Sequence, residues 1–173
     1  MMIDLSENDY LAFCLLKLFS TFEYSLKSSG FRIIQKEKGT EKARYDAKAD
    51  WDSFARNEEV VQWYNEIDDS VIKDNIGYLL KEPPKKQMII DGNFDWVVVP
   101  LPDSSSEAEL LFLYIRRIRN NLFHGGKFAG NNWEDHMRSG KLIEASINIL
   151  NAAIDAHAGV KKIHVGAWSQ LLN

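Results

Sequence analysis

The feature that most constrains this fold is the spacing of the apolar residues, which follows a helical period over most of the chain. Ser6 is suited to cap the first such segment, and Gly30 lies just past its end, so a helix is predicted over residues 6–28. Its apolar positions extend around the helix, which predicts burial on more than one side. They are Leu11, Phe13, Cys14, Leu15, Leu16, Leu18, Phe19, Phe22 and Leu26.

Two further stretches carry the same period. One runs from Trp51 to Leu80, with a break near 68–70, and Pro83-Pro84 ends it. The other predicts a helix over 132–157, with Gly159 just beyond its end. The buried seam predicted for that last helix consists of Met137, Leu142, Ala145, Ile149, Ala153 and Ala156.

Two segments depart from the helical pattern. Residues 36–50 are rich in charge and fit either a loop or a solvated helix. Around 87–99, Asp91-Gly92 separates two β-prone runs, which predicts a small hairpin or an extended insertion that leans on the helices. The expected fold is therefore all-α, a bundle of four to five helices with this insertion.

The segment 104–124 has the clearest helix signals. Ser104 and Glu107 have the spacing of a capping box, and Gly125-Gly126 supplies a terminator after His124. The predicted core stripe is Leu111, Ile115, Ile118 and Leu122. The opposite side also carries apolar residues among its polar ones, which predicts contact with a second surface. This side consists of Leu110, Leu113, Arg116, Arg117, Asn120 and His124.

Composition sets the class of protein. Hydrophobic residues make up 45% and charged residues 27% of the 173 residues, as in a soluble globular protein, and one domain over 1–173 is expected. Because the chain has one cysteine, Cys14, a disulfide framework is excluded, and Cys14 itself is better interpreted as a core residue. The first residues lack a basic secretory signal, and no apolar run is long enough to span a bilayer. A cytoplasmic location without membrane contact is expected.

Charge is distributed unevenly. The net charge is −4, yet the segment from Leu110 to Lys127 contains only basic charged residues. A phosphate-bearing ligand fits this basic island, which consists of Arg116, Arg117, Arg119 and Lys127. A solvated helix face is the alternative. Nucleophile elbows, phosphate loops and dinucleotide fingerprints are missing, and the four histidines lack metal-site spacing, so no cofactor or metal is expected. His157 and His164 are interpreted as surface or capping residues.

Within the island, Arg119 and His124 form an Arg-x4-His pattern at the end of the predicted helix, with Asn120 directly after the arginine. This motif and the order of the helices resemble the HEPN superfamily, in particular HEPN-like proteins of plasmids and integron cassettes. Arg119, Asn120 and His124 match the motif of its ribonuclease members residue by residue. Gly126 stands where one toxin subgroup has a tyrosine, so nucleotidylation at that position is not expected.

The resemblance implies metal-independent cleavage of RNA, in which a ribose 2′-hydroxyl attacks the adjacent phosphate. His124 suits proton transfer, because imidazole titrates near neutral pH. Arg119 suits stabilisation of the developing negative charge, and Asn120 can orient the histidine or the substrate. Arg116, Arg117 and Lys127 are expected to bind the RNA phosphates.

Arg119 and His124 lie about 140° apart on an ideal helix, so one chain brings them together poorly. HEPN domains commonly dimerise through the motif helix, which implies a homodimer through 104–124 with both motifs in one groove. The implied role is that of a toxin or phage-defence effector, with an antitoxin as a further partner. Two alternatives stay open: a non-catalytic HEPN-like domain that binds RNA or nucleotide or acts as a scaffold, and a purely structural helical protein.

Overall fold

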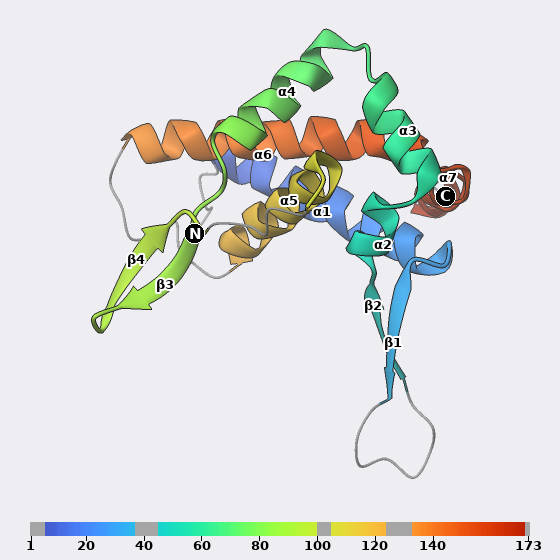
Figure 1. Cartoon of the computed structure of the whole chain (residues 1–173), viewed down its shortest axis with the longest axis horizontal. Helices are drawn as coiled ribbons and strands as arrows, with labels where there is room; N and C mark the ends of the chain where they lie inside the picture. The colour runs from blue at the N-terminus through green and yellow to red at the C-terminus, as the bar shows by residue number, and fades with distance from the viewer. Residues whose placement is uncertain (1–5, 37–44, 100–104, 124–132, 172–173) are drawn as a thin grey trace.

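Helices form most of the described chain, and two short antiparallel hairpins lie between them (Figure 1). The computed structural model describes residues 6–36, 45–99, 105–123 and 133–171. The described α-helices number seven, more than the four or five predicted. The elements are α1 (Glu7–Ser28), β1 (Arg32–Lys36), β2 (Tyr45–Ala49), α2 (Trp51–Ala55), α3 (Glu58–Glu66), α4 (Ser70–Lys81), β3 (Lys86–Ile90), β4 (Asn93–Val97), α5 (Glu107–Phe123), α6 (Trp133–Ala153), the 3₁₀ turn η1 (Ile154–Ala156) and α7 (Ala158–Leu171).

The first helix is capped as predicted. The Ser6 hydroxyl accepts from the Asp9 backbone N–H at 3.3 Å, and the Asp9 carboxylate accepts from the Ser6 N–H at 2.9 Å, which completes a capping box. At the other end Gly30 has φ +104°, a left-handed conformation that suits glycine. Both helix boundaries therefore follow from local sequence alone.

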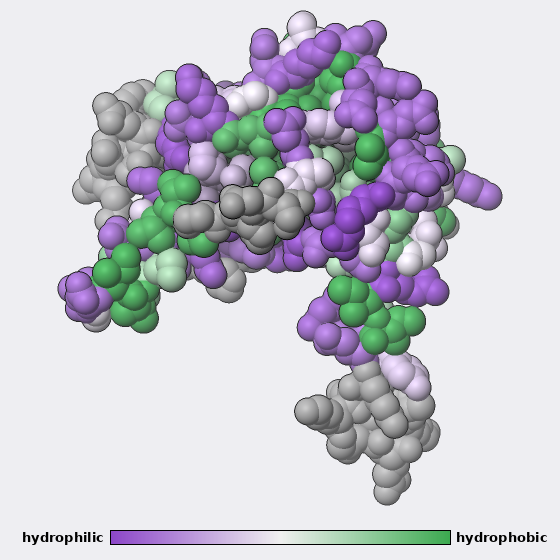
Figure 2. Space-filling model, viewed as in Figure 1, coloured by the Kyte–Doolittle hydropathy of each residue, from purple (hydrophilic) through white to green (hydrophobic). Residues whose placement is uncertain are grey.

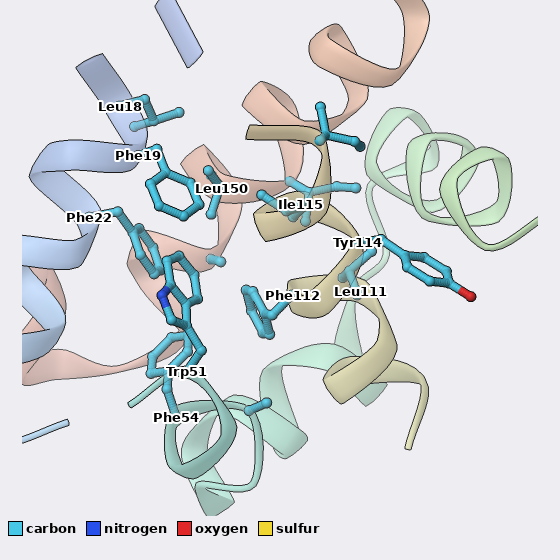
Figure 3. Packing of buried hydrophobic residues seen from close by; sticks show 14 of the residues in the cluster. Leu18, Phe19, Phe22, Trp51, Phe54, Leu111, Phe112, Tyr114, Ile115 and Leu150 are labelled. Atoms are coloured by element: carbon cyan, nitrogen blue, oxygen red, sulfur yellow. The ribbon is translucent and has the colours of Figure 1, made fainter. Parts of the chain in front are cut away.

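The core forms where α1 meets α2, α5, α6 and α7. An aromatic cluster lies at its centre, and Figure 3 shows rings from three helices around it. The ring of Trp51 stacks on Phe22 at 5.3 Å between centroids, while Phe112 contacts Phe54 edge-on at 5.3 Å. Each of these rings is almost completely buried. The exposed Phe13 is the exception to the predicted burial of α1 on several sides.

The stretch from Trp51 to Leu80 forms three helices. The predicted break near 68–70 is confirmed, because Asp69 caps α4 by accepting from the backbone N–H groups of Val71 and Ile72. A second break was not predicted. It lies at Asn57, whose side chain accepts from the Glu59 N–H and starts α3.

Residues 45–49 form a strand, so neither a loop nor a solvated helix describes them. The β2 strand pairs antiparallel with β1, with Arg32 opposite Ala49 and Lys36 opposite Tyr45. Tyr45, Ala47 and Ala49 alternate with Asp46 and Lys48, a short strand pattern that lies within the charge-rich segment 36–50. The hairpin predicted around 87–99 is confirmed as β3–β4. Its turn, Asp91-Gly92, has φ values of +50° and +81°, as a two-residue hairpin turn of type I′ requires.

The predicted helix over 132–157 ends early. His157 adopts an extended backbone after η1, and a separate helix, α7, follows and packs against α1. The His157 ring caps α7, since its Nδ1 accepts from the Val160 N–H at 3.3 Å. Gly159 lies inside α7 and does not end a helix. Most of the predicted seam is buried, from Leu142 to Ala156, but Met137 is 50% exposed.

His164 of α7 is buried, so its interpretation as a surface or capping residue is wrong. The buried position lowers the pKa of the His164 imidazole, because desolvation disfavours its charged form. The two histidines of the C-terminal region thus have structural places, one as a cap and one inside the packing of α7.

The aromatic cluster predicts a large difference between two phenylalanines. Phe112→Ala should lower the free energy of unfolding by about 3–5 kcal/mol, because it leaves a cavity between Trp51 and Phe54. Phe13→Ala is the matched control, and it should change stability by no more than about 0.5 kcal/mol, since Phe13 is 63% exposed. Urea denaturation of both variants measures the difference. Equal losses would show that the cluster does not hold the core together.

Candidate functional site

The helix that carries the Arg-x4-His motif is α5, and it begins two residues later than predicted. Ser106 and Glu109 form the capping box: the Ser106 N–H donates to the Glu109 carboxylate at 2.9 Å, and the Glu109 N–H donates to the Ser106 hydroxyl at 3.3 Å. The Glu107 carboxylate accepts from the Tyr64 hydroxyl at 3.0 Å, so it takes no part in the box. Three consecutive serines offered alternative caps, and Glu107 is used to join α3 to α5. Ser104 lies outside the described residues.

The buried side of α5 is wider than the predicted stripe. Leu111, Ile115 and Ile118 are buried as predicted, and Leu122 is half-buried. Phe112 and Tyr114 are buried as well, because α5 has neighbours on several sides: α1, α2, α4, α6 and β3. The second surface predicted from Leu110 and Leu113 is therefore partly covered within the chain, since both side chains are half-buried.

Arg119 lies on the side of α5 that faces α1. Its guanidinium carbon is 5.0 Å from the centroid of the Phe19 ring, a cation–π arrangement. Phe19 stacks on Trp51 at 5.0 Å, so the surface beneath the guanidinium belongs to the aromatic cluster. Arg119 Nη1 also donates to Asn120 Oδ1 at 3.0 Å. These two contacts fix the direction of the guanidinium.

Asn120 is exposed, and its amide is joined to Arg119, so two of the three motif residues are brought together. The described part of α5 continues to Phe123, one residue before His124. His124 itself, the predicted Gly125-Gly126 terminator and Lys127 lie outside the described residues. Arg119 and Asn120 lie in a helix, as predicted, within the last described turns of α5.

The predicted phosphate-binding arginines point toward different neighbours. Arg116 forms an ion pair with Asp52 of α2 at 3.4 Å, and these side chains are 37% and 68% exposed. Exposed pairs of this kind contribute little stability and exchange readily. Arg117 Nη1 donates to the Pro84 carbonyl at 3.2 Å, and burial lowers the pKa of its guanidinium. The arginines of the basic island therefore spread over three sides of α5.

Sequence reasoning missed a cluster of donors around residues 82–85, the connection that leads from α4 into β3. Asn121 Nδ2 donates to the Lys85 carbonyl at 2.8 Å, next to the Arg117 contact. Arg138 of α6 donates to the Pro83 carbonyl at 2.9 Å. Together α5 and α6 bind three consecutive carbonyls of this connection, Pro83 to Lys85. No pattern in the sequence indicates these contacts, because every residue has a backbone carbonyl.

Glu23 of α1 accepts from the Trp51 indole N–H at 3.2 Å and is half-buried. Among the residues that the structure describes, no group of three or more His, Cys, Asp or Glu side chains is placed to hold a metal ion. None of the described helices is both long enough and apolar enough to cross a lipid bilayer.

Comparison with known proteins gives no neighbour: no family model, no curated protein and no solved structure matches this chain. The function must therefore be argued from the chemistry of the residues themselves.

The contacts at residues 82–85 predict that Asn121 holds the root of the β3–β4 hairpin. Asn121→Ala removes one hydrogen bond of about 1 kcal/mol, so the β3 amides should exchange hydrogen about fivefold faster. Asn75→Ala is the matched control, because Asn75 Nδ2 also donates to a carbonyl, that of Val71 in its own helix. Unchanged exchange in β3 for the Asn121 variant would contradict the anchoring role.

Proposed function

We propose that this protein is a metal-independent endoribonuclease of the HEPN type, and that Arg119, Asn120 and His124 form its catalytic motif. The observation that carries the proposal is the fixed guanidinium of Arg119. It lies over Phe19 and is joined to exposed Asn120 in the last described turns of α5, one turn before His124. The mostly helical class of the fold agrees with a HEPN-like bundle.

The reaction needs only groups that these residues supply. The ribose 2′-oxygen attacks the adjacent phosphorus, and the bond from phosphorus to the 5′-oxygen of the next nucleotide breaks. The products are a 2′,3′-cyclic phosphate and a free 5′-hydroxyl. His124 accepts the proton of the 2′-hydroxyl as a general base and then donates a proton to the departing 5′-oxygen as a general acid. Arg119 stabilises the charge that develops on the phosphate oxygens.

A homodimer brings two copies of the motif into one groove. Two residues five positions apart on an ideal helix are offset by about 140°, so we expect a second chain to bring a histidine to Arg119 more easily than the same chain. Exposed Asn120 marks the part of α5 that is open to a second copy. In this arrangement Arg116, Arg117 and Lys127 bind the RNA on either side of the cut. The biological role we propose is that of a toxin or phage-defence effector in the cytoplasm, with an antitoxin as a partner.

One observation favours a second candidate, a non-catalytic HEPN-like RNA-binding or scaffold domain. The Arg119 side chain is half-buried, and the contact with the Phe19 ring is one that a purely structural arginine also makes. Replacing a structural arginine lowers the free energy of unfolding and leaves the rate of RNA cleavage unchanged. Replacing a catalytic arginine lowers the rate and leaves the free energy of unfolding unchanged. The two candidates therefore predict different results for the same variant.

The purified protein should cleave a mixed RNA pool in excess chelator and leave cyclic phosphate ends. His124→Ala and Arg119→Met should each lower cleavage at least about a hundredfold, because each removes proton transfer or charge stabilisation. Arg32→Met is the matched control, since Arg32 is exposed and its guanidinium donates to the Lys27 carbonyl in place of an RNA phosphate. Cleavage that chelator abolishes and magnesium restores would contradict this mechanism. Arg119→Met that only lowers stability supports the non-catalytic candidate.

The dimer predicts a mass near twice 19.9 kDa in light scattering. Specific RNA cleavage should fall as the protein is diluted below the dissociation constant, because each groove needs two chains. Analytical ultracentrifugation measures the same constant independently. A monomer that cleaves RNA with constant specific activity at high dilution would leave the catalytic residues in place and exclude the shared groove.

A further inference from the structure

The β3–β4 hairpin is held in a fixed position relative to the motif helix. Its root is bound by Asn121, Arg117 and Arg138, through the carbonyls of three consecutive residues that precede β3. Figure 1 shows it leaving the body beside the end of α5 that carries the motif. Whatever the hairpin binds is therefore held near Asn120, the direct neighbour of Asn121.

One face of the hairpin is apolar, aromatic and open to solvent. Ile89 and Phe94 lie directly opposite each other in the register, and they are 68% and 75% exposed. Trp96, which is half-buried, lies on the same face, two residues along β4 and about 7 Å from Phe94. Asp95 points to the other face by strand alternation, so no carboxylate interrupts this aromatic face. Figure 2 shows the exposed hydrophobic surface on the hairpin.

Positive charge surrounds the root of the hairpin. Lys85 and Lys86 are exposed, and neither occurs in an ion pair among the described residues. Arg117 adds a third charge, and the Pro84 carbonyl to which it donates is neutral. A two-stranded hairpin is only marginally stable in water, so an exposed face of this kind is best explained by an occupant.

We propose that the two rings of this face, Phe94 and Trp96, form a stacking platform for single-stranded RNA, with Lys85 binding its phosphates. The choice of RNA rests on the proposed function and on charge complementarity, since cations beside exposed rings are the features that bind single strands. A protein partner would use the aliphatic and the aromatic side chains alike. The platform holds the RNA strand that leads into the cleavage site. Phe94 lies three residues, or about 10 Å, from the root of the hairpin, a distance that about three stacked nucleotides span at about 3.4 Å each.

The test measures binding of a fluorescein-labelled single-stranded oligoadenylate by fluorescence anisotropy, in the non-cleaving His124→Ala background. Phe94→Ala should raise the dissociation constant about tenfold, and Phe94→Tyr should restore it, because either ring can stack on a base. Ile89→Ala is the matched control, an equally exposed apolar side chain without a ring, and it should stay within about twofold. Lys85→Ala should lower the slope of log K against log salt by about 0.7.

The contrary results are distinct. Equal affinity for the parent and Phe94→Ala overturns the platform, as does an equal loss in Phe94→Ala and Ile89→Ala. A fall in the mass of the protein in both of these variants, with RNA affinity unchanged, assigns the face to a second copy of the chain and also overturns it. If the protein with His124 intact never cleaves RNA but binds it through Phe94, the proposed function fails and the platform stands. If the protein cleaves RNA but Phe94→Ala leaves RNA binding unchanged, the proposed function stands and the platform fails.

Discussion

The packing of α1 against the aromatic cluster is the constraint on which the rest of the structure depends. Phe19 and Phe22 both stack on Trp51, and Trp51 in turn contacts Phe112 of α5. Aromatic rings bury large areas and accept only a few relative orientations, so this cluster fixes α1, α2 and α5 against one another. Its outer ring, Phe19, also lies beneath the guanidinium of Arg119. The candidate catalytic arginine is thus positioned directly by the core.

The charges of α5 show how one short basic segment can have several roles. Arg116 joins α5 to α2, and Arg117 with Asn121 joins it to the connection before β3. Arg119 is directed to α1 and Asn120. Because neighbouring positions on a helix point in directions 100° apart, adjacent arginines cannot bind the same phosphate unless the substrate wraps around the helix. A substrate of that extent is a polymer, which is consistent with RNA and with the hairpin as a second contact.

The sequence predicted the parts of the fold that depend on interactions between residues close together in the chain. The caps at Ser6 and Asp69 satisfy backbone donors within a few residues, and Asp91-Gly92 sets a turn by its own backbone preference. The α5 cap moved from Ser104 to Ser106 because Glu107 is engaged by Tyr64, a residue distant in sequence. Likewise, the separate helix α7 depends on the extended backbone at His157, whose ring packs on Phe31.

The candidate site likewise has a part that the sequence predicts and a part that it does not. The motif could be found from spacing alone, since Arg119 and Asn120 are adjacent and lie near a helix end. The contacts of Arg138 and Asn121 with residues 83–85 could not be predicted, because backbone carbonyls leave no trace in residue identity. For the same reason, the hydrogen bond from Arg117, a predicted phosphate ligand, to the Pro84 carbonyl could not be predicted.

The central claim is that Arg119 and His124 act as one catalytic pair drawn from two chains. Mixing two inactive variants, Arg119→Met and His124→Ala, tests it most directly. Random pairing forms mixed dimers in which one of the two sites has both groups intact, so RNA cleavage in chelator should return to about a quarter of the wild-type rate. A mixture that stays as inactive as its components, beside an active wild type, would contradict the shared site.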